Sequence, residues 1–290
     1  MTATRTDEGG GKEFLRVAEE LRGRMVDGAY PLGSYLPAQS ALATEFGVSR
    51  NTVQRVIEEL RNEGWIESRQ GTGSRVVKNQ RIQSWSPRAS RSRQALTLGP
   101  LISEAFERPE VTLDVYTLTS ESLDAHIRLQ AERIRTRNIS PQRIALRVLL
   151  PTESMTLPYP RAKDDKDDPR LQDRLHRITK RHTESLREVL MALEAENLVP
   201  SVELGIRHTP LTPTFKLYVI NGAEVLHGAY TVIERAVVLD DGDRITALDV
   251  LGYGATLTHH VKDADPTSPG SVFVEGMTTW FESVWTRLAD

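Results

Sequence analysis

The stretch LPAQSALATEFGVSRNTVQRVIEELRNEGWIESRQGTGSRVV, residues 36–77, decides the fold of the N-terminal part of the chain. Leu42, Ala43 and Phe46 fall on one face of a helix, and Gly47 follows where a tight turn needs a positive φ. Ser49 comes next, and serine is a residue type that caps helix N-termini. The pattern therefore predicts two helices joined by a glycine turn, which is helix-turn-helix spacing.

The helix after Ser49 should bury one apolar stripe and expose its polar side. Valine, isoleucine and leucine recur along this segment at helical spacing, so the residues between them face solvent. The exposed positions are then Arg50, Asn51, Gln54, Arg55 and Arg61.

The residues after Gly64 change to the period of strands. Residues 65–68 and 74–77 predict two short strands, and the Gly-rich segment 69–73 between them predicts a hairpin tip. Upstream, an apolar stripe over 12–27 predicts a further helix that ends before Gly28. Three helices followed by a two-stranded wing make residues 1–78 a winged helix-turn-helix domain.

This ordered set resembles the DNA-binding domain of the GntR family of transcriptional regulators. The resemblance covers residues 12–78, about a quarter of the chain. It includes the Gly-x-Tyr-Pro-x-Gly turn at 28–33, the Leu-Pro before the second helix, the Val-Ser-Arg-x-Thr-Val start of the third helix and the wing glycines.

The resemblance implies which residues meet DNA, because in this family the third helix enters the major groove and the wing reaches the minor groove. Arg50 has the fork geometry for guanine or phosphate, and Gln54 could pair with adenine. Some relatives carry arginine at the position of Gln54, which leaves the operator sequence open. The implied contacts are Ser49, Arg50, Asn51, Thr52, Gln54 and Arg55 on the helix, and Arg69, Gln70, Gly71, Thr72 and Gly73 at the wing.

The N-terminal part of the chain is basic and the rest is acidic, which indicates a polyanion partner for the N-terminal part only. Residues 1–95 carry a net charge of +4 and the rest carries −7, within a total of −3. The segment 79–95 is Ser/Arg-rich without helical or strand period. We interpret it as a basic interdomain linker, or alternatively as an additional phosphate-binding arm.

Residues 96–290 predict a larger α/β domain for effector binding and dimerisation. Strands are expected at 111–116, 144–150, 202–207, 215–220, 225–230, 232–239 and 244–251, and helices at 121–138, 169–197 and 272–288. So many strands exclude the all-helical effector domain of some GntR relatives, and the chain is too short for the aminotransferase-like fusion. A chorismate-lyase-like domain stays open.

The segment around Lys216 also resembles a degenerate phospholipase-D-like strand. Thr214, Lys216 and Asn221 occupy the places of the histidine, lysine and aspartate of that family's HxKxxxxD motif. A phosphohistidine cannot form without the histidine, so we expect no enzymatic activity. Lys216 and Asn221 are retained as candidate effector-binding residues, and Lys216 has the alternative of a partly exposed strand lysine.

Histidines give no convincing metal site. His259 and His260 are adjacent, so on a strand they point to opposite faces, and His182 lies on the apolar stripe of its helix as a core or interface residue. The absence of cysteine excludes disulfides and thiolate metal sites. We expect no metal and no cofactor.

The sequence thus predicts a DNA-binding transcriptional regulator that binds a palindromic operator as a homodimer. We also expect that a small-molecule effector modulates binding. A cytoplasmic location without membrane association is expected, since the chain has neither a secretory signal nor an apolar run of 18 residues. Two alternatives are a DNA-tethered phosphodiesterase or nuclease with a degenerate active site, and a DNA-binding protein that senses no signal.

Overall fold

The computed structural model describes residues 7–26, 29–30, 33–62, 65–69, 73–76, 82–84, 98–239, 242–250 and 257–290. The chain divides into two compact units. One contains residues 1–79 and 236–244, and the other contains residues 80–235 and 245–290.

The N-terminal unit has the predicted three helices and hairpin. They are α1 (Asp7–Val26), α2 (Gln39–Phe46), α3 (Arg50–Asn62), β1 (Ile66–Arg69) and β2 (Gly73–Val76). Side chains from α1 and α3 meet in a core that also holds the fully buried Trp65. The largest fully buried residues here are Leu21, Met25, Leu42, Leu60, Trp65 and Ile66.

The segment before α2 extends the wing sheet by backbone pairing. Gly33 N donates to the carbonyl of Val76 and Val76 N to that of Ser34, both at 2.8 Å. The Nε of Arg75 adds a bond to the carbonyl of Gly33 at 3.1 Å. Gly33, the last residue of the motif that marked the family resemblance, therefore anchors the base of the wing.

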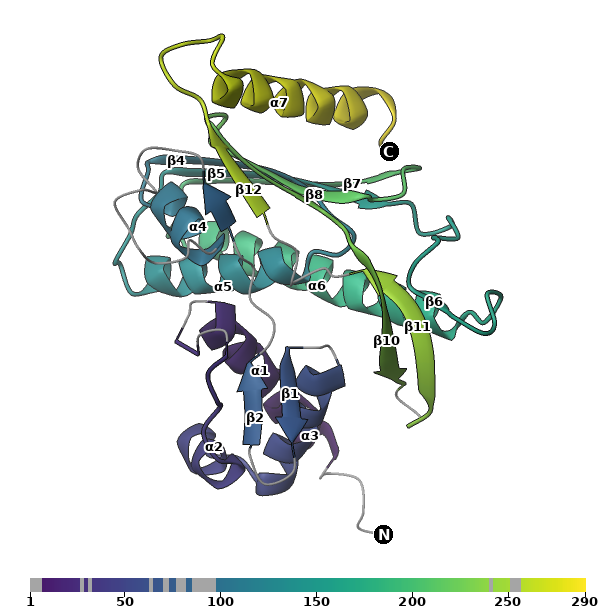
Figure 1. Cartoon of the computed structure of the whole chain (residues 1–290). Helices are drawn as coiled ribbons and strands as arrows, with labels where there is room; N and C mark the ends of the chain where they lie inside the picture. The colour runs from purple at the N-terminus through teal and green to yellow at the C-terminus, as the bar shows by residue number, and fades with distance from the viewer. Residues whose placement is uncertain are drawn as a thin grey trace. The chain divides into compact units, whose positions relative to one another are not determined.

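The C-terminal unit is built on a seven-stranded mixed sheet. Figure 1 shows helices on both faces of this sheet. Helices α5 and α6 cover one face with α4, and α7 covers part of the other. The helices are α4 (Leu98–Phe106), α5 (Glu121–Arg135), α6 (Arg170–Ala195) and α7 (Pro269–Arg287). In spatial order the strands are β3 (Ile82–Ser84), β12 (Leu257–Val261), β9 (Glu224–Ala229), β8 (Phe215–Ile220), β4 (Glu110–Tyr116), β5 (Arg143–Pro151) and β7 (Ser201–Thr209).

A second, three-stranded sheet completes the fold in the order β10 (Val232–Val238), β11 (Arg244–Val250) and β6 (Arg161–Ala162). Strand β11 pairs antiparallel with β6. The predicted strands and helices of this region all occur, with ends shifted by three residues at most.

The central strands β4 and β5 alternate in a way that explains the two layers. Leu113 and Leu146 belong to the core beneath α5 and α6, whereas Tyr116 and Leu149 belong to the core beneath α7. Earlier along the same strands, the α7 side carries polar residues instead, including Arg147. Helix α7 therefore covers only one end of its face of the sheet, and no other described helix covers the rest.

The predicted linker 79–95 needs a correction. Residues 82–84 form strand β3, which pairs parallel with β12 in the register Leu257↔Ile82. A strand of three residues has too few positions to show a period, and its partner lies far along the chain. The rest of that segment, and with it the proposed phosphate-binding arm, falls outside the described residues.

Two glycines of α7 should respond in opposite ways to alanine. A Cβ at Gly270 would lie 2.5 Å from the carbonyl oxygen of Val261, whereas a Cβ at Gly276 meets nothing within 4 Å. Gly270→Ala should destabilise the unit by about 1–3 kcal/mol because backbone must move. Gly276→Ala should stabilise it by up to about 1 kcal/mol, the difference in helix propensity. Urea unfolding of both variants checks this, and equal effects would contradict it.

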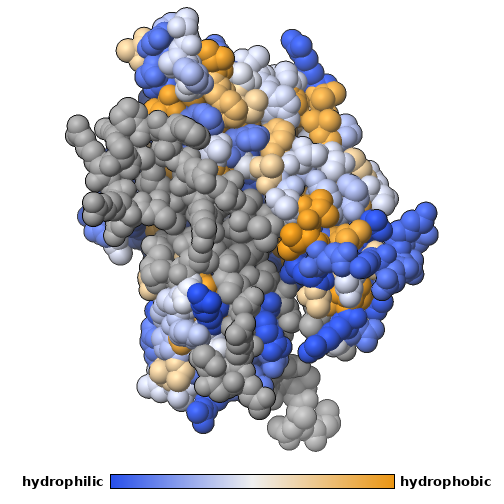
Figure 2. Space-filling model, viewed as in Figure 1, coloured by the Kyte–Doolittle hydropathy of each residue, from blue (hydrophilic) through white to orange (hydrophobic). Residues whose placement is uncertain are grey.

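No helix among the described residues is long and apolar enough to cross a membrane. Figure 2 shows small hydrophobic groups scattered among hydrophilic residues on the coloured part of the visible surface.

Candidate nucleic-acid interface

The turn between α2 and α3 has the geometry that the sequence predicted. Gly47 adopts the left-handed conformation at φ 65°, and Val48 N donates to the carbonyl of Ala43 at 3.0 Å. A residue with a side chain is strained at this φ, so glycine fits here. The turn fixes the direction in which α3 leaves α2.

Ser49 caps α3 as predicted. Its Oγ accepts a hydrogen bond from Thr52 N at 3.0 Å and lies 2.9 Å from Thr52 Oγ1. The Thr52 residue is only 8% exposed, so its hydroxyl serves the cap and is not presented to a ligand. The expectation that Thr52 contacts DNA does not agree with this burial, and we remove it from the candidate contacts.

The other predicted helix contacts lie on one accessible side of α3. Ser49, Arg50, Asn51, Gln54 and Arg55 are all exposed. Arg50 and Asn51 make no side-chain hydrogen bond or ion pair to any other described residue. Gln54 bonds Glu58 only weakly, at 3.4 Å, and the Arg55 guanidinium lies 5.1 Å from the centre of the Phe14 ring. The first turns of α3 thus present several donors that the described part of the protein does not occupy.

The wing is described only up to its tip. Arg69 pairs with Gly73 across the hairpin, and Gly73 is exposed with φ 91°. Gln70, Gly71 and Thr72, which complete the predicted contact set, lie outside the described residues.

Lys216 and Asn221 lie at opposite ends of β8 and do not form one site. Asn221 adopts φ 50°, and its Oδ1 accepts from Thr112 N at 2.8 Å while its own N donates to the Thr112 carbonyl. Both bonds tie the end of β8 to β4. The two candidate effector-binding residues therefore do not come together, and the Asn221 side chain is engaged in the sheet.

Lys216 is buried at 4% exposure, so the alternative of a partly exposed lysine is also wrong. Its Nζ lies 3.3 Å from Ser122 Oγ and 5.9 Å from the centre of the Tyr230 ring. His126 lies on the same side, from α5. Burial, with a contribution from the Lys216 charge, lowers the pKa of His126 to about 3.

The depressed pKa of His126 predicts that acid destabilises the C-terminal unit. In the unfolded chain, the His126 imidazole takes up a proton below about pH 6.5. In the folded chain, the same imidazole stays neutral until about pH 3. Stability present above pH 6.5 is therefore lost as the pH falls, by about 2 kcal/mol at pH 5. Urea unfolding of wild type and His126→Gln at pH 7 and pH 5 measures it. An equal loss in both proteins would refute the assignment to His126.

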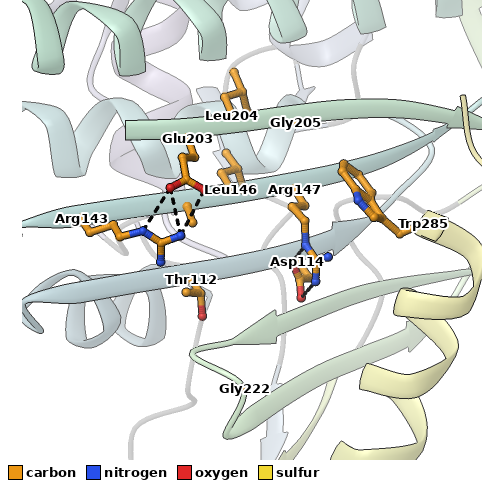
Figure 3. Close-up of a pocket in the computed structure, with 11 residues that line it drawn as sticks. Thr112, Asp114, Arg143, Leu146, Arg147, Glu203, Leu204, Gly205, Gly222 and Trp285 are labelled. Atoms are coloured by element: carbon orange, nitrogen blue, oxygen red, sulfur yellow. Dashed lines mark hydrogen bonds and ion pairs between the residues drawn. The ribbon is translucent and has the colours of Figure 1, made fainter. Parts of the chain in front are cut away.

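An open groove lies on the sheet face beside α7 (Figure 3). Its volume is about 700 Å³. Arg143 forms a bidentate pair with Glu203 at 3.1 Å, and Arg147 pairs with Asp114. Hydrogen bonds to Asp114 and Glu282 raise the pKa of the Arg147 guanidinium. Trp285 closes the α7 end of the groove, so the walls are an aromatic ring and paired charges.

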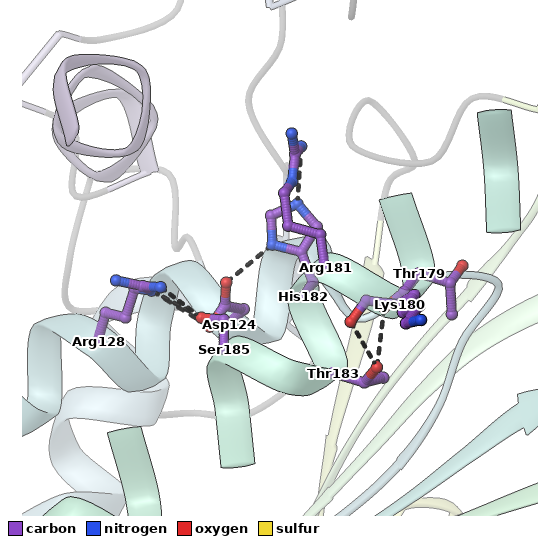
Figure 4. Close-up of polar contacts among 8 residues, drawn as sticks. All are labelled: Asp124, Arg128, Thr179, Lys180, Arg181, His182, Thr183 and Ser185. Atoms are coloured by element: carbon purple, nitrogen blue, oxygen red, sulfur yellow. Dashed lines mark hydrogen bonds and ion pairs between the residues drawn. The ribbon is translucent and has the colours of Figure 1, made fainter. Parts of the chain in front are cut away.

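A buried polar cluster joins α5 to α6 (Figure 4). Asp124 accepts from the Ser185 hydroxyl and from His182 Nδ1 at 2.8 Å, and the Arg128 Nε donates to Ser185 Oγ at 2.9 Å. His182 is 3% exposed, as predicted for a core histidine. Its Nε2 faces Arg181 at 3.3 Å and not the serine. Since His182 does not act as a base on Ser185, the cluster is a cross-link and not a nucleophilic triad.

Several polar residues that now stand out were not foreseen from the sequence. Asp124 lies 58 positions before His182, and Arg143 lies 60 positions before Glu203. Strand alternation could have placed Arg143 and Arg147 on one face of β5, but it could not have paired them with residues on other strands. The described residues hold no cluster of three or more metal-binding side chains.

The geometry of the N-terminal unit is that of a winged helix-turn-helix DNA-binding domain. Residues 14–76 match the family model described as bacterial regulatory proteins, gntR family. The N-terminal domain is therefore of the GntR type.

Two curated relatives match over a length similar to that of this domain. The chain is 40% identical over 67 residues to the Exu regulon transcriptional regulator of Escherichia coli K12, which covers 23% of this chain and 26% of the relative. It is 39% identical over 69 residues to the mannosyl-D-glycerate transport/metabolism system repressor MngR of the same organism, covering 24% and 28%. The match thus spans about a quarter of these relatives.

Among solved structures, the DNA-binding domain of AraR in complex with operator ORX1 is 27% identical, with a TM-score of 0.23. It covers 27% of this chain and 93% of that one. The family model and the two regulators lend no support to the phospholipase-D-like resemblance of the C-terminal domain, nor to the phosphodiesterase alternative that depended on it.

Proposed function

We propose that this protein is a transcriptional regulator that binds a specific palindromic operator. The observation that carries the proposal is the exposed start of α3, where Arg50 and Asn51 project from a capped helix within a GntR-type domain. Donors that are not already bonded inside the protein can contact base edges from a rigid helix without first breaking other bonds.

A gel shift with DNA from upstream of the protein's own coding region tests the proposal. Specific binding should survive excess unrelated DNA, and it should weaken with salt by the amount expected for a limited number of phosphate contacts. Weak binding without sequence preference, which collapses as salt rises, would reject sequence-specific regulation and leave only an electrostatic DNA anchor.

A homodimer is part of the proposal because a palindromic operator presents two equivalent half-sites. Two reading helices held one helical turn of DNA apart multiply affinity. The C-terminal α/β domain would supply the contact between subunits. Size-exclusion chromatography of the complex should show two chains per operator, and one chain per operator would reject this part.

We further propose that the groove beside α7 binds a small anionic effector. Its volume of about 700 Å³ lies within the range of ligand pockets. A carboxylate or phosphate could replace Glu203 as the partner of Arg143, because both groups match the guanidinium fork. Organic acids and sugar phosphates should be screened for release of the operator complex. If none changes the affinity, the protein binds DNA without sensing such a signal.

A further inference from the structure

Strand β7 is an edge strand whose outer side is only partly occupied. It pairs parallel with β5 on one side, and no described strand pairs with it on the other. Ser201 N donates to the carbonyl of Gln142, and the Thr209 carbonyl accepts from Thr152 N, on the two residues that flank β5. The backbone N–H and C=O groups of the odd-numbered residues of β7 therefore point toward β5. The N–H and C=O groups of the even-numbered residues therefore point away from the sheet.

Both ends of this outer side are already bonded. Val202 N donates to Glu194 Oε1 at 3.1 Å, and His208 exchanges two backbone hydrogen bonds with Asp290. Between them, the N–H and C=O groups of Leu204 and Ile206 have no partner in the part of the chain that the structure describes. A strand edge with unpaired N–H and C=O groups can form hydrogen bonds with a strand of another chain. Strand β7 contains no proline or lysine, the residues that commonly prevent such pairing.

We propose that two copies of this chain pair antiparallel through β7, with the two-fold axis at Gly205. In that register Leu204 faces Ile206 of the partner subunit and exchanges both backbone bonds with it. By symmetry, Ile206 exchanges two backbone bonds with Leu204 of the partner subunit. Four hydrogen bonds then satisfy the N–H and C=O groups of Leu204 and Ile206 on both edges, which fits the isologous interface of a C2 dimer. The pairing is confined to residues 203–207, and the two strands diverge beyond them, because Asp290 already occupies the place opposite His208. The inference rests on the proposed homodimer and assigns its surface.

Side chains in this register are complementary on both faces. On the α7 side, Glu203 comes directly opposite Arg207 of the partner subunit, and the same pair recurs across the axis. On the α6 side, the partly buried Leu204 and Ile206 meet their counterparts. Gly205 sits on the axis, and Trp285 already covers it at 2.9 Å from the place of a Cβ. Figure 3 shows Glu203, Leu204 and Gly205 in sequence along this strand.

Charge reversal tests the register by sedimentation of the full chain. Glu203→Arg puts like charges opposite each other twice in the dimer, and it should raise the dimer Kd by about tenfold or more. Arg207→Glu should do the same. The double variant Glu203→Arg/Arg207→Glu restores opposite charges and should recover dimerisation.

The matched control is Arg143→Glu. It breaks the same ion pair with Glu203 and leaves like charges side by side within one chain, but it does not face the partner subunit. It should stay dimeric, and circular dichroism checks that every variant is folded. A wild-type chain that remains monomeric, or a dimer unaffected by both single reversals, would overturn the proposal.

Operator binding separates this inference from the proposed function. A wild-type dimer that responds to the reversals but binds no specific DNA would retain the β7 interface and reject the regulator. Specific binding by a dimer that ignores the reversals would retain the regulator and place the interface elsewhere.

Discussion

Asp124→Ala should lower the free energy of unfolding of the C-terminal unit by about 3–5 kcal/mol. Asp124 is 2% exposed and accepts hydrogen bonds from Ser185 and His182, while Arg128 approaches the same carboxylate at 3.4 Å. Removal of the carboxylate leaves these donors without their shared acceptor in the interior. Urea unfolding at pH 7, followed by circular dichroism, measures the loss.

Two variants show whether the charge or the hydrogen bonds matter. Asp124→Asn keeps one acceptor oxygen, so it should cost less than Asp124→Ala. Glu132→Ala is the control on the same helix, because Glu132 is exposed and pairs with Arg135 at the surface. It should change stability by less than about 1 kcal/mol. A loss for Asp124→Ala no larger than for Glu132→Ala would show that the cluster does not cross-link α5 to α6.

The N-terminal domain was predictable because its signals are local. The Gly47 turn, the Ser49 cap and the apolar stripe of α3 all depend on neighbours within a few residues. The burial of Thr52 was not foreseen, since a threonine three residues after a capping serine can either support the cap or face solvent. Only the geometry of the hydroxyl decides between these.

Two elements of the C-terminal unit, α4 and β12, were not predicted from the sequence. Helix α4 was missed because Gly99 and Pro100 are typical of a turn, although proline is tolerated in the first turn of a helix. Strand β12 was missed because its two histidines obscure the alternation, and its identity as a strand depends on pairing with β9. The surroundings of Lys216 and Asn221 were not foreseen for a similar reason, since their partners lie on α5 and β4.

The groove and the β7 edge could not have been found from the sequence either. A run such as Ser201–Thr209 predicts a strand, but nothing in it says whether the strand lies in the middle of a sheet or at its edge. That position follows from the order of seven strands, which includes one from the supposed linker. The interface proposed at Gly205 therefore depends on topology and not on any motif.

Arg50→Ala should weaken specific operator binding by about 1–3 kcal/mol. Arg50 is exposed at the first position of α3, and its guanidinium has no bonded partner among the described residues. Its loss removes a contact to DNA without disturbing a known bond inside the protein. A titration of the operator at fixed salt measures the change, and unchanged affinity would remove Arg50 from the interface.

Two further variants define what Arg50 contacts. Arg61→Ala is the control, because Arg61 is also exposed but lies in the last turn of the same helix, and it should leave affinity nearly unchanged. Arg50→Lys keeps the positive charge but lacks the planar fork that binds guanine at two atoms. If Arg50 grips a phosphate, the lysine variant should retain most of the affinity for every sequence. If Arg50 reads guanine, the lysine variant should lose discrimination at one base pair in each half-site, and the altered position would identify the base that this residue selects.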